Sequence, residues 1–98
     1  MPYITKENRE KVDWKINDLI DVVRGQLGYQ DTGGANYVIT RTILNIMKPP
    51  TGWSYDSLSD VVKTLESVKA EVQRRLLGPY EDKCINKNGD LKEFEEGH

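Results

Sequence analysis

The chain has 98 residues, of which 37% are hydrophobic and 31% are charged, with 14 basic residues against 16 acidic ones. This length suits a single small domain with a thin core, so we expect contact with a second copy or a partner to add stability. The formal charge of -2 and the dispersed basic residues argue against nucleic-acid binding, because contacts to phosphates need a basic patch.

A single cysteine, Cys84, excludes an internal disulfide and a multi-cysteine metal site within one chain. No apolar run approaches the roughly 20 residues of a membrane span, and the polar start lacks the apolar centre of a secretion signal. We therefore expect a soluble protein of a reducing cytoplasm.

The first predicted helix begins near Thr5 and carries an apolar stripe at helical spacing. The stripe consists of Val12, Ile16, Leu19, Ile20, Val23 and Leu27. Trp14 falls on the opposite side of this helix. An aromatic side chain away from the apolar stripe is a candidate contact with another segment or another molecule.

Glycines from Gly25 to Gly34 break the pattern and predict a loop ahead of a second helix from Ala35 to Lys48. Pro49 and Pro50 end that helix. Tyr37 and Arg41 lie four residues apart on the rim of its apolar face.

The third predicted helix starts after an N-cap at Ser54 or Ser57, and Ser57 with Asp60 has the spacing of a capping box. It runs to about Leu77 and carries an apolar stripe that consists of Leu58, Val61, Val62, Leu65, Val68 and Val72. Gly78 and Pro79 predict a bend, followed by a short C-terminal helix to about Lys87.

These elements predict an all-α fold, a small bundle of three main helices plus a short C-terminal helix. We expect a single helical domain over residues 1–90. Residues 91–98 are acidic and poor in apolar side chains, and they predict a flexible tail.

The inventory of catalytic groups is poor, because it holds one histidine, His98, at the extreme C-terminus and one cysteine, Cys84, for which we expect partial burial. Helix-start electrostatics explain Glu81 and Asp82 without a metal ion. We expect neither an enzyme nor a bound metal or cofactor.

Three arginines and several tyrosines form the most suggestive polar set. They are Tyr37, Arg41, Tyr55, Arg74, Arg75 and Tyr80. If the second and third helices pack antiparallel, Arg41 approaches Arg74, and an oligomer multiplies the cluster into a pocket for an anionic nucleotide. The structural alternative pairs Arg75 with Glu71, and Arg74 or Arg41 with Glu81 or Asp82.

Several short segments together resemble a family of small uncharacterised proteins, a domain of unknown function that is frequent in bacteriophage and bacterial genomes. The segments are Pro2-Tyr3-Ile4 with Glu7 and Arg9, Asn36 to Arg41, Arg74-Arg75 followed by Pro79 to Asp82, and Asn88-Gly89-Asp90. The loop from Gly25 to Gly34 is longer than in that family, and the tail is extended. The resemblance implies a phage or bacterial protein and carries no established activity.

The first functional hypothesis is a non-catalytic interaction module, a homo-oligomer that binds a host protein through Trp14, Trp53 or the acidic tail. A phage origin implies an accessory or host-modulating role in the cytoplasm of a bacterial host cell. The alternative is a small-ligand binder that sequesters an anionic nucleotide signal. A helix-turn-helix nucleic-acid regulator ranks third, because the connection from Pro49 to Trp53 is rich in proline and few basic residues lie near Ser54.

Overall fold

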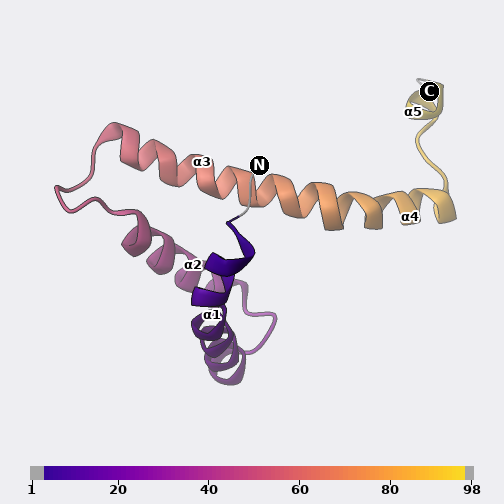
Figure 1. The fold of residues 1–98 in the computed structure, drawn as a ribbon. Helices are drawn as coiled ribbons and strands as arrows, with labels where there is room; N and C mark the ends of the chain where they lie inside the picture. Colours follow the sequence, from indigo (N-terminus) through magenta and orange to yellow (C-terminus); the bar gives the residue numbers. More distant parts are fainter. Residues whose placement is uncertain (1–3, 97–98) are drawn as a thin grey trace. The chain divides into compact units, whose positions relative to one another are not determined.

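The computed structural model describes residues 4–96, which form helices and no strand (Figure 1). The all-α prediction is confirmed for this range. The helices are α1 (Lys6–Leu27), α2 (Thr32–Met47), α3 (Tyr55–Val72), the π-helical turn η1 (Gln73–Leu77), α4 (Gly78–Asn88) and α5 (Lys92–Glu96).

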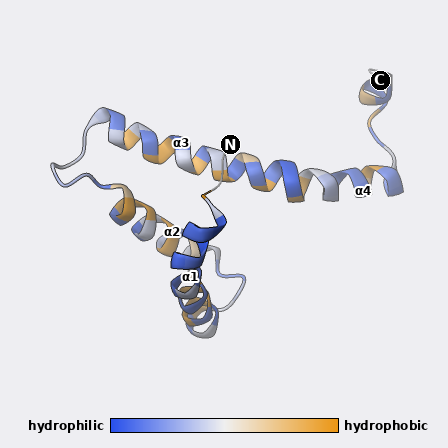
Figure 2. Ribbon diagram, in the orientation of Figure 1, coloured by the Kyte–Doolittle hydropathy of each residue, from blue (hydrophilic) through white to orange (hydrophobic). Residues whose placement is uncertain are grey.

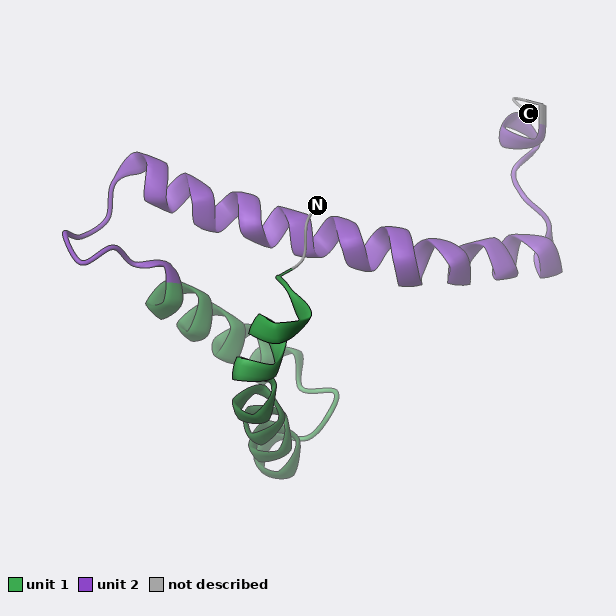
Figure 3. Ribbon diagram, viewed as in Figure 1, with its two compact units in different colours: residues 1–46 green, residues 47–98 purple. Residues whose placement is uncertain are grey.

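The chain divides into two compact units, residues 1–46 and residues 47–98 (Figure 3). The first unit holds α1 and nearly all of α2, and the second holds α3 to α5. The assignment of one domain over residues 1–90 with a tail over residues 91–98 stays a prediction. In the described part of that tail, Lys92–Glu96 is helical.

Helix α1 begins as expected, because the backbone N–H of Asn8 donates to Thr5 Oγ1 at 3.2 Å and so satisfies one of the unpaired donors of the first turn. The prediction that the helix breaks at Gly25 is wrong. The helix continues to Leu27 and stops at Gly28, whose φ of +88° suits a residue without a side chain.

Helix α2 begins at Thr32, ahead of the predicted start at Ala35. Asp31 causes this difference, because its Oδ1 accepts the backbone N–H of Gly34 at 2.8 Å and caps the new helix. Gly34 also lies against the end of α1, where an added Cβ atom would stand 2.8 Å from Leu27 Cδ1.

A capping box starts α3, but with different residues from those expected. The backbone N–H of Ser57 donates to Ser54 Oγ at 3.1 Å, and the backbone N–H of Ser54 donates to Ser57 Oγ at 2.8 Å. The predicted box of Ser57 with Asp60 is wrong, because Ser57 itself occupies the third helical position.

Helix α3 passes without interruption through η1 into α4 (Figure 1). In place of the predicted bend at Gly78 and Pro79, the helix continues through a π turn, in which the Gly78 N–H donates to the Gln73 carbonyl five residues earlier. A Cβ at position 78 would stand 3.0 Å from that oxygen, which explains the glycine. The long helix ends at Asn88, before Gly89 with φ +87°.

Burial within the units is slight. Val61 is 6% exposed and is the buried residue of the described range, and partial burial gathers in the segment before it, at Met47, Pro49, Gly52, Trp53, Ser57 and Ser59. Hydrophobic and hydrophilic residues alternate along α3 (Figure 2). Apart from Val61, the large apolar side chains of α3 are exposed. The helices are therefore shown, whereas their packing into a bundle is not.

The predicted partial burial of Cys84 is wrong, because its side chain is exposed on α4. A helix that packs against no other helix of its unit leaves every side exposed to water, so an apolar stripe there does not predict burial. No helix among the described residues is both long enough and apolar enough to cross a membrane.

Candidate functional site

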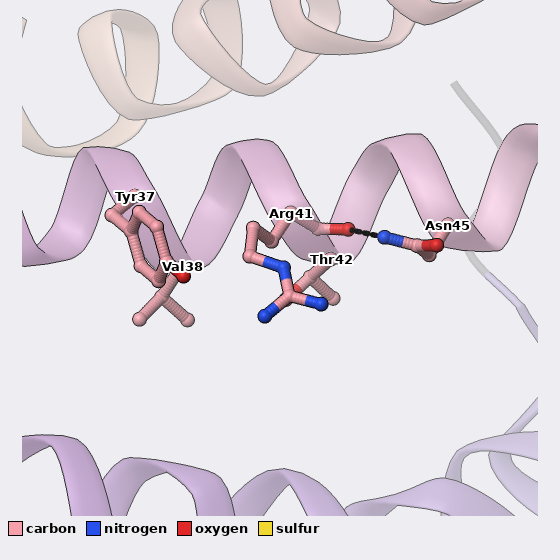
Figure 4. Close-up of a pocket in the computed structure, with 5 residues that line it drawn as sticks. All are labelled: Tyr37, Val38, Arg41, Thr42 and Asn45. Carbon is pink, nitrogen blue, oxygen red and sulfur yellow. Dashed lines mark hydrogen bonds between the residues drawn. The ribbon is translucent and has the colours of Figure 1, made fainter.

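Five side chains of α2 line a shallow hollow of about 350 Å³ (Figure 4). They are Tyr37, Val38, Arg41, Thr42 and Asn45. Their positions recur at one-, four-, five- and eight-residue intervals from Tyr37, which places them along one side of an α-helix. A phenol, a guanidinium, a hydroxyl and an amide thus converge on one surface.

Arg41 and Tyr37 form the polar centre of this hollow. The Arg41 Cζ atom lies 6.0 Å from the centroid of the Tyr37 ring, at the outer limit of a cation–π contact. Asn45 Nδ2 donates to the Arg41 carbonyl at 2.7 Å, so the amide is held against the backbone. Within the described residues of this unit, Arg41 has no carboxylate partner. The N–H groups of its guanidinium can therefore donate hydrogen bonds to an anion.

Arg74 and Arg75 lie on η1 and share one carboxylate. Arg74 Nη2 lies 2.9 Å from Glu71 Oε1, and Arg75 Nη1 lies 3.7 Å from Glu71 Oε2. The predicted pair of Arg75 with Glu71 is confirmed. Arg74 joins the same carboxylate, so the expectation that it pairs with Glu81 or Asp82 is wrong in the part of the chain that the structure describes.

These two ion pairs are exposed, because the side chains of Arg74 and Arg75 retain 70% and 59% of their accessible surface. Exposed pairs on a helix contribute roughly 0.3–0.5 kcal/mol each. The pairs therefore order the arginines on the helix and contribute little to its stability.

The expected cluster of arginines and tyrosines is distributed over both units. Tyr37 and Arg41 lie together on α2, Arg74 and Arg75 lie together on η1, and Tyr80 is 66% exposed on α4. The approach of Arg41 to Arg74 stays a prediction.

The two tryptophans differ in their accessibility. Trp14 is 59% exposed on α1, and Lys15 Nζ lies 4.4 Å from the centroid of its ring. Trp53 is half-buried in the connection before α3. Of the two predicted interaction residues, Trp14 thus presents the larger free aromatic surface.

Several apolar side chains whose spacing predicts a buried face are exposed to solvent in the structure. A hollow of about 220 Å³ between α1 and α2 is lined mainly by apolar side chains, among them Leu19, Val23 and Ile39. On α3, Leu58 and Val62 line a second hollow together with Tyr55 and Ser59. The helical spacing of these residues was the signal for a buried face, and it did not identify what buries it.

Among the described residues, no three side chains of the metal-binding types gather closely enough to hold an ion. Asp90, which the sequence places after Glu81 and Asp82, instead accepts the backbone N–H of Leu91 on its Oδ1 at 2.7 Å.

Comparison with known proteins gives a family and no characterised relative. No curated protein and no solved structure matches this chain. The family model described as "Domain of unknown function (DUF6899)" matches residues 1–91, and the chain belongs to that family.

Proposed function

We propose that this protein is a non-catalytic interaction module that works as a homo-oligomer. The single observation that carries the proposal is the exposure of the apolar faces: seven side chains along α3, η1 and α4 retain 40–66% of their surface. They are Leu58, Val62, Leu65, Val68, Val72, Leu77 and Tyr80. In the oligomer these faces meet and complete the helical bundle that the sequence predicts.

The balance of energies supports association. Full burial of a valine or leucine side chain contributes about 1.5–3 kcal/mol, so burial of the exposed half contributes about 1 kcal/mol. Seven such side chains per copy contribute on the order of 14 kcal/mol to a pair of copies. Association costs about 4–15 kcal/mol, so the two terms are comparable and self-association is feasible.

Folding and association are coupled in this proposal. Ordering the chain costs roughly 1–2 kcal/mol of backbone entropy per residue, which a unit with one buried apolar residue does not offset alone. A homo-oligomer with no stable folded monomer loses its helices when it dissociates. In a bacterial host cell, such a module acts by binding a host protein, with Trp14 as an accessible contact.

The test measures mass and helicity over the same range of concentration. Sedimentation equilibrium or native mass spectrometry gives the mass, and circular dichroism at 222 nm gives the helicity. We expect both to fall together on dilution. A monomer whose helicity does not change with concentration refutes the proposal.

A second candidate function, sequestration of an anionic nucleotide, is favoured by one observation, the hollow on α2 with Tyr37 and Arg41 at its centre. The guanidinium suits a phosphate, and the exposed ring suits a base. A hydrogen bond to a charged group contributes about 1.5–3 kcal/mol, so Arg41→Ala weakens binding roughly 10- to 100-fold.

Arg24→Ala is the matched control for that test. Arg24 also lies over a tyrosine ring, that of Tyr29, at 5.9 Å, but it borders the apolar hollow of α1 and α2. Titration calorimetry with adenosine triphosphate compares the two variants with the unchanged protein. Absence of binding to the unchanged protein, or equal losses in both variants, removes this candidate.

A further inference from the structure

The long helix made of α3, η1 and α4 carries the longest apolar face in the described chain. Its three segments have 18, 5 and 11 residues, so it spans roughly 50 Å. The seven exposed apolar side chains named above, together with Cys84, are called here the long-helix stripe. The stripe needs a cover, because no second helix of its unit lies along it in the described residues.

The π turn keeps this stripe on one side of the helix. In a regular α-helix each residue advances by roughly 100°, so Tyr80 would lie about 80° and Cys84 about 120° around the axis from Val72. A π turn takes in about one additional residue and turns the following residues back by roughly 100°. Tyr80 and Cys84 then lie within about 20° of Val72, and the stripe continues through α4.

The length of the stripe selects its cover. Helices α1 and α2 have 22 and 16 residues and span roughly 33 Å and 24 Å. The stripe runs roughly 39 Å from Leu58 to Cys84, so among the described helices the one long enough to cover all of it is the same long helix of another copy. We propose that the long-helix stripe pairs with the long-helix stripe of a second copy in antiparallel orientation. This inference rests on the proposed function, for which it names the interface.

Charge sets the orientation. Asp56 and Asp60 make the start of the long helix acidic, whereas Lys83 and Lys87 balance Glu81 and Asp82 in α4 and Lys87 lies in the last turn. An antiparallel pair brings each acidic start beside the last turn of the other copy, and the helix dipoles also oppose one another. A parallel pair brings the two acidic starts together and places Arg74 and Arg75 beside the same arginines of the other copy.

One register pairs six of the eight residues of the stripe with one another. With Glu71 at the centre of the pair, Leu58 faces the second copy's Cys84, Val62 faces its Tyr80, and Leu65 faces its Leu77. In this register Asp60 and Asp56 lie within one residue of the level of the second copy's Lys83 and Lys87 along the axis, but on the side of the helix away from the stripe, so their charges act across the pair without direct contact. Each contact occurs twice, as two-fold symmetry requires.

The native Cys84 is a reporter of this register. In the antiparallel pair the two copies of Cys84 lie roughly 39 Å apart, so they do not form a disulfide. Leu58→Cys places a second thiol opposite each Cys84. With oxidised glutathione as the oxidant, we expect more than half of this variant, and less than a tenth of the unchanged protein, to run as a covalent dimer on a non-reducing gel.

Asp56→Cys is the matched control. It lies two residues from Leu58 and about 200° around the helix, on the side away from the stripe, so we expect it not to cross-link. A second pair of thiols, Leu65→Cys with Leu77→Cys in a Cys84→Ser background, tests the same register if Leu58→Cys does not fold. Circular dichroism establishes which variants are helical.

Native mass spectrometry of the unchanged protein distinguishes failure of the antiparallel pairing from failure of the proposed homo-oligomer. If the protein is an oligomer and Cys84 cross-links to Cys84 of another copy, the antiparallel pairing is overturned. It is also overturned if the Leu58→Cys and Leu65→Cys/Leu77→Cys variants are helical and do not cross-link. Either result leaves the interaction module standing. A monomer overturns both. Cross-linking of Leu58→Cys without cross-linking of Asp56→Cys establishes the interface.

Discussion

Deleting one leucine side chain distinguishes an interface from an exposed surface. Leu65 lies in the middle of α3 and is 40% exposed in the isolated chain. If Leu65 is equally exposed in the working protein, Leu65→Ala lowers the free energy of unfolding by less than about 2 kcal/mol, because the exposed part of the side chain gains nothing from burial. If a second copy covers it, the substitution leaves a cavity and costs about 2–5 kcal/mol for each copy.

The consequence for association is large, because each contact occurs twice in a symmetric pair. Two substitutions at about 2 kcal/mol each add up to about 4 kcal/mol, which raises the dissociation constant of a dimer roughly 1000-fold. Sedimentation equilibrium measures this constant, and circular dichroism measures the accompanying loss of helicity.

Leu91→Ala provides the control, since it deletes the same atoms from a side chain that is 61% exposed between α4 and α5, outside the long helix. We expect its dissociation constant to stay within about threefold of that of the unchanged protein. Equal dissociation constants for Leu65→Ala and Leu91→Ala would refute the reasoning.

Four further substitutions test local features by thermal unfolding at fixed protein concentration. Ser54→Ala removes the Oγ that accepts the Ser57 N–H, while the Ser54 N–H can still donate to Ser57 Oγ, and the substitution should cost about 1 kcal/mol; an unchanged midpoint would contradict the role of the cap. Glu71→Gln should cost less than about 1 kcal/mol, because both arginines that it pairs with are exposed; a larger loss would indicate that they are buried in the oligomer. Gly25→Ala, in open space within α1, should stabilise by about 0.5–1 kcal/mol, whereas Gly28→Ala, at φ +88°, should destabilise by about 1 kcal/mol; the same sign for both would contradict the end of α1 at Leu27.

Local signals in the sequence predicted the helices well and their ends less well. Thr5 and the two prolines at 49 and 50 limit helices through short-range chemistry, and the structure places helix ends beside them. Gly25 and Gly33 misled the prediction, because a glycine inside a helix costs only about 1 kcal/mol and neighbouring residues offset that cost. At Gly33 the compensating group is the Asp31 carboxylate, which caps the helix from outside.

In the candidate site, too, short-range contacts were predictable and other features were not. The pair of Arg75 with Glu71 was predictable, because residues four apart on a helix are neighbours. The pair of Arg74 with Glu71 has the equally common spacing of three residues, and the prediction overlooked it in favour of Glu81 or Asp82. No pattern in the sequence indicated a π turn. Burial was the least predictable property, since apolar spacing reveals which side of a helix avoids water but not which molecule covers it.

The π turn also affects how the length of this helix can change. Loss of one residue from an ordinary helix rotates everything beyond it by roughly 100° and moves an apolar side chain to the wet side. Between Gln73 and Leu77 the chain already holds about one residue more than a regular α-helix needs. A single-codon deletion there returns the segment to regular α geometry and leaves both flanking halves in phase, so this is the place where relatives of the protein can differ in helix length without losing the stripe.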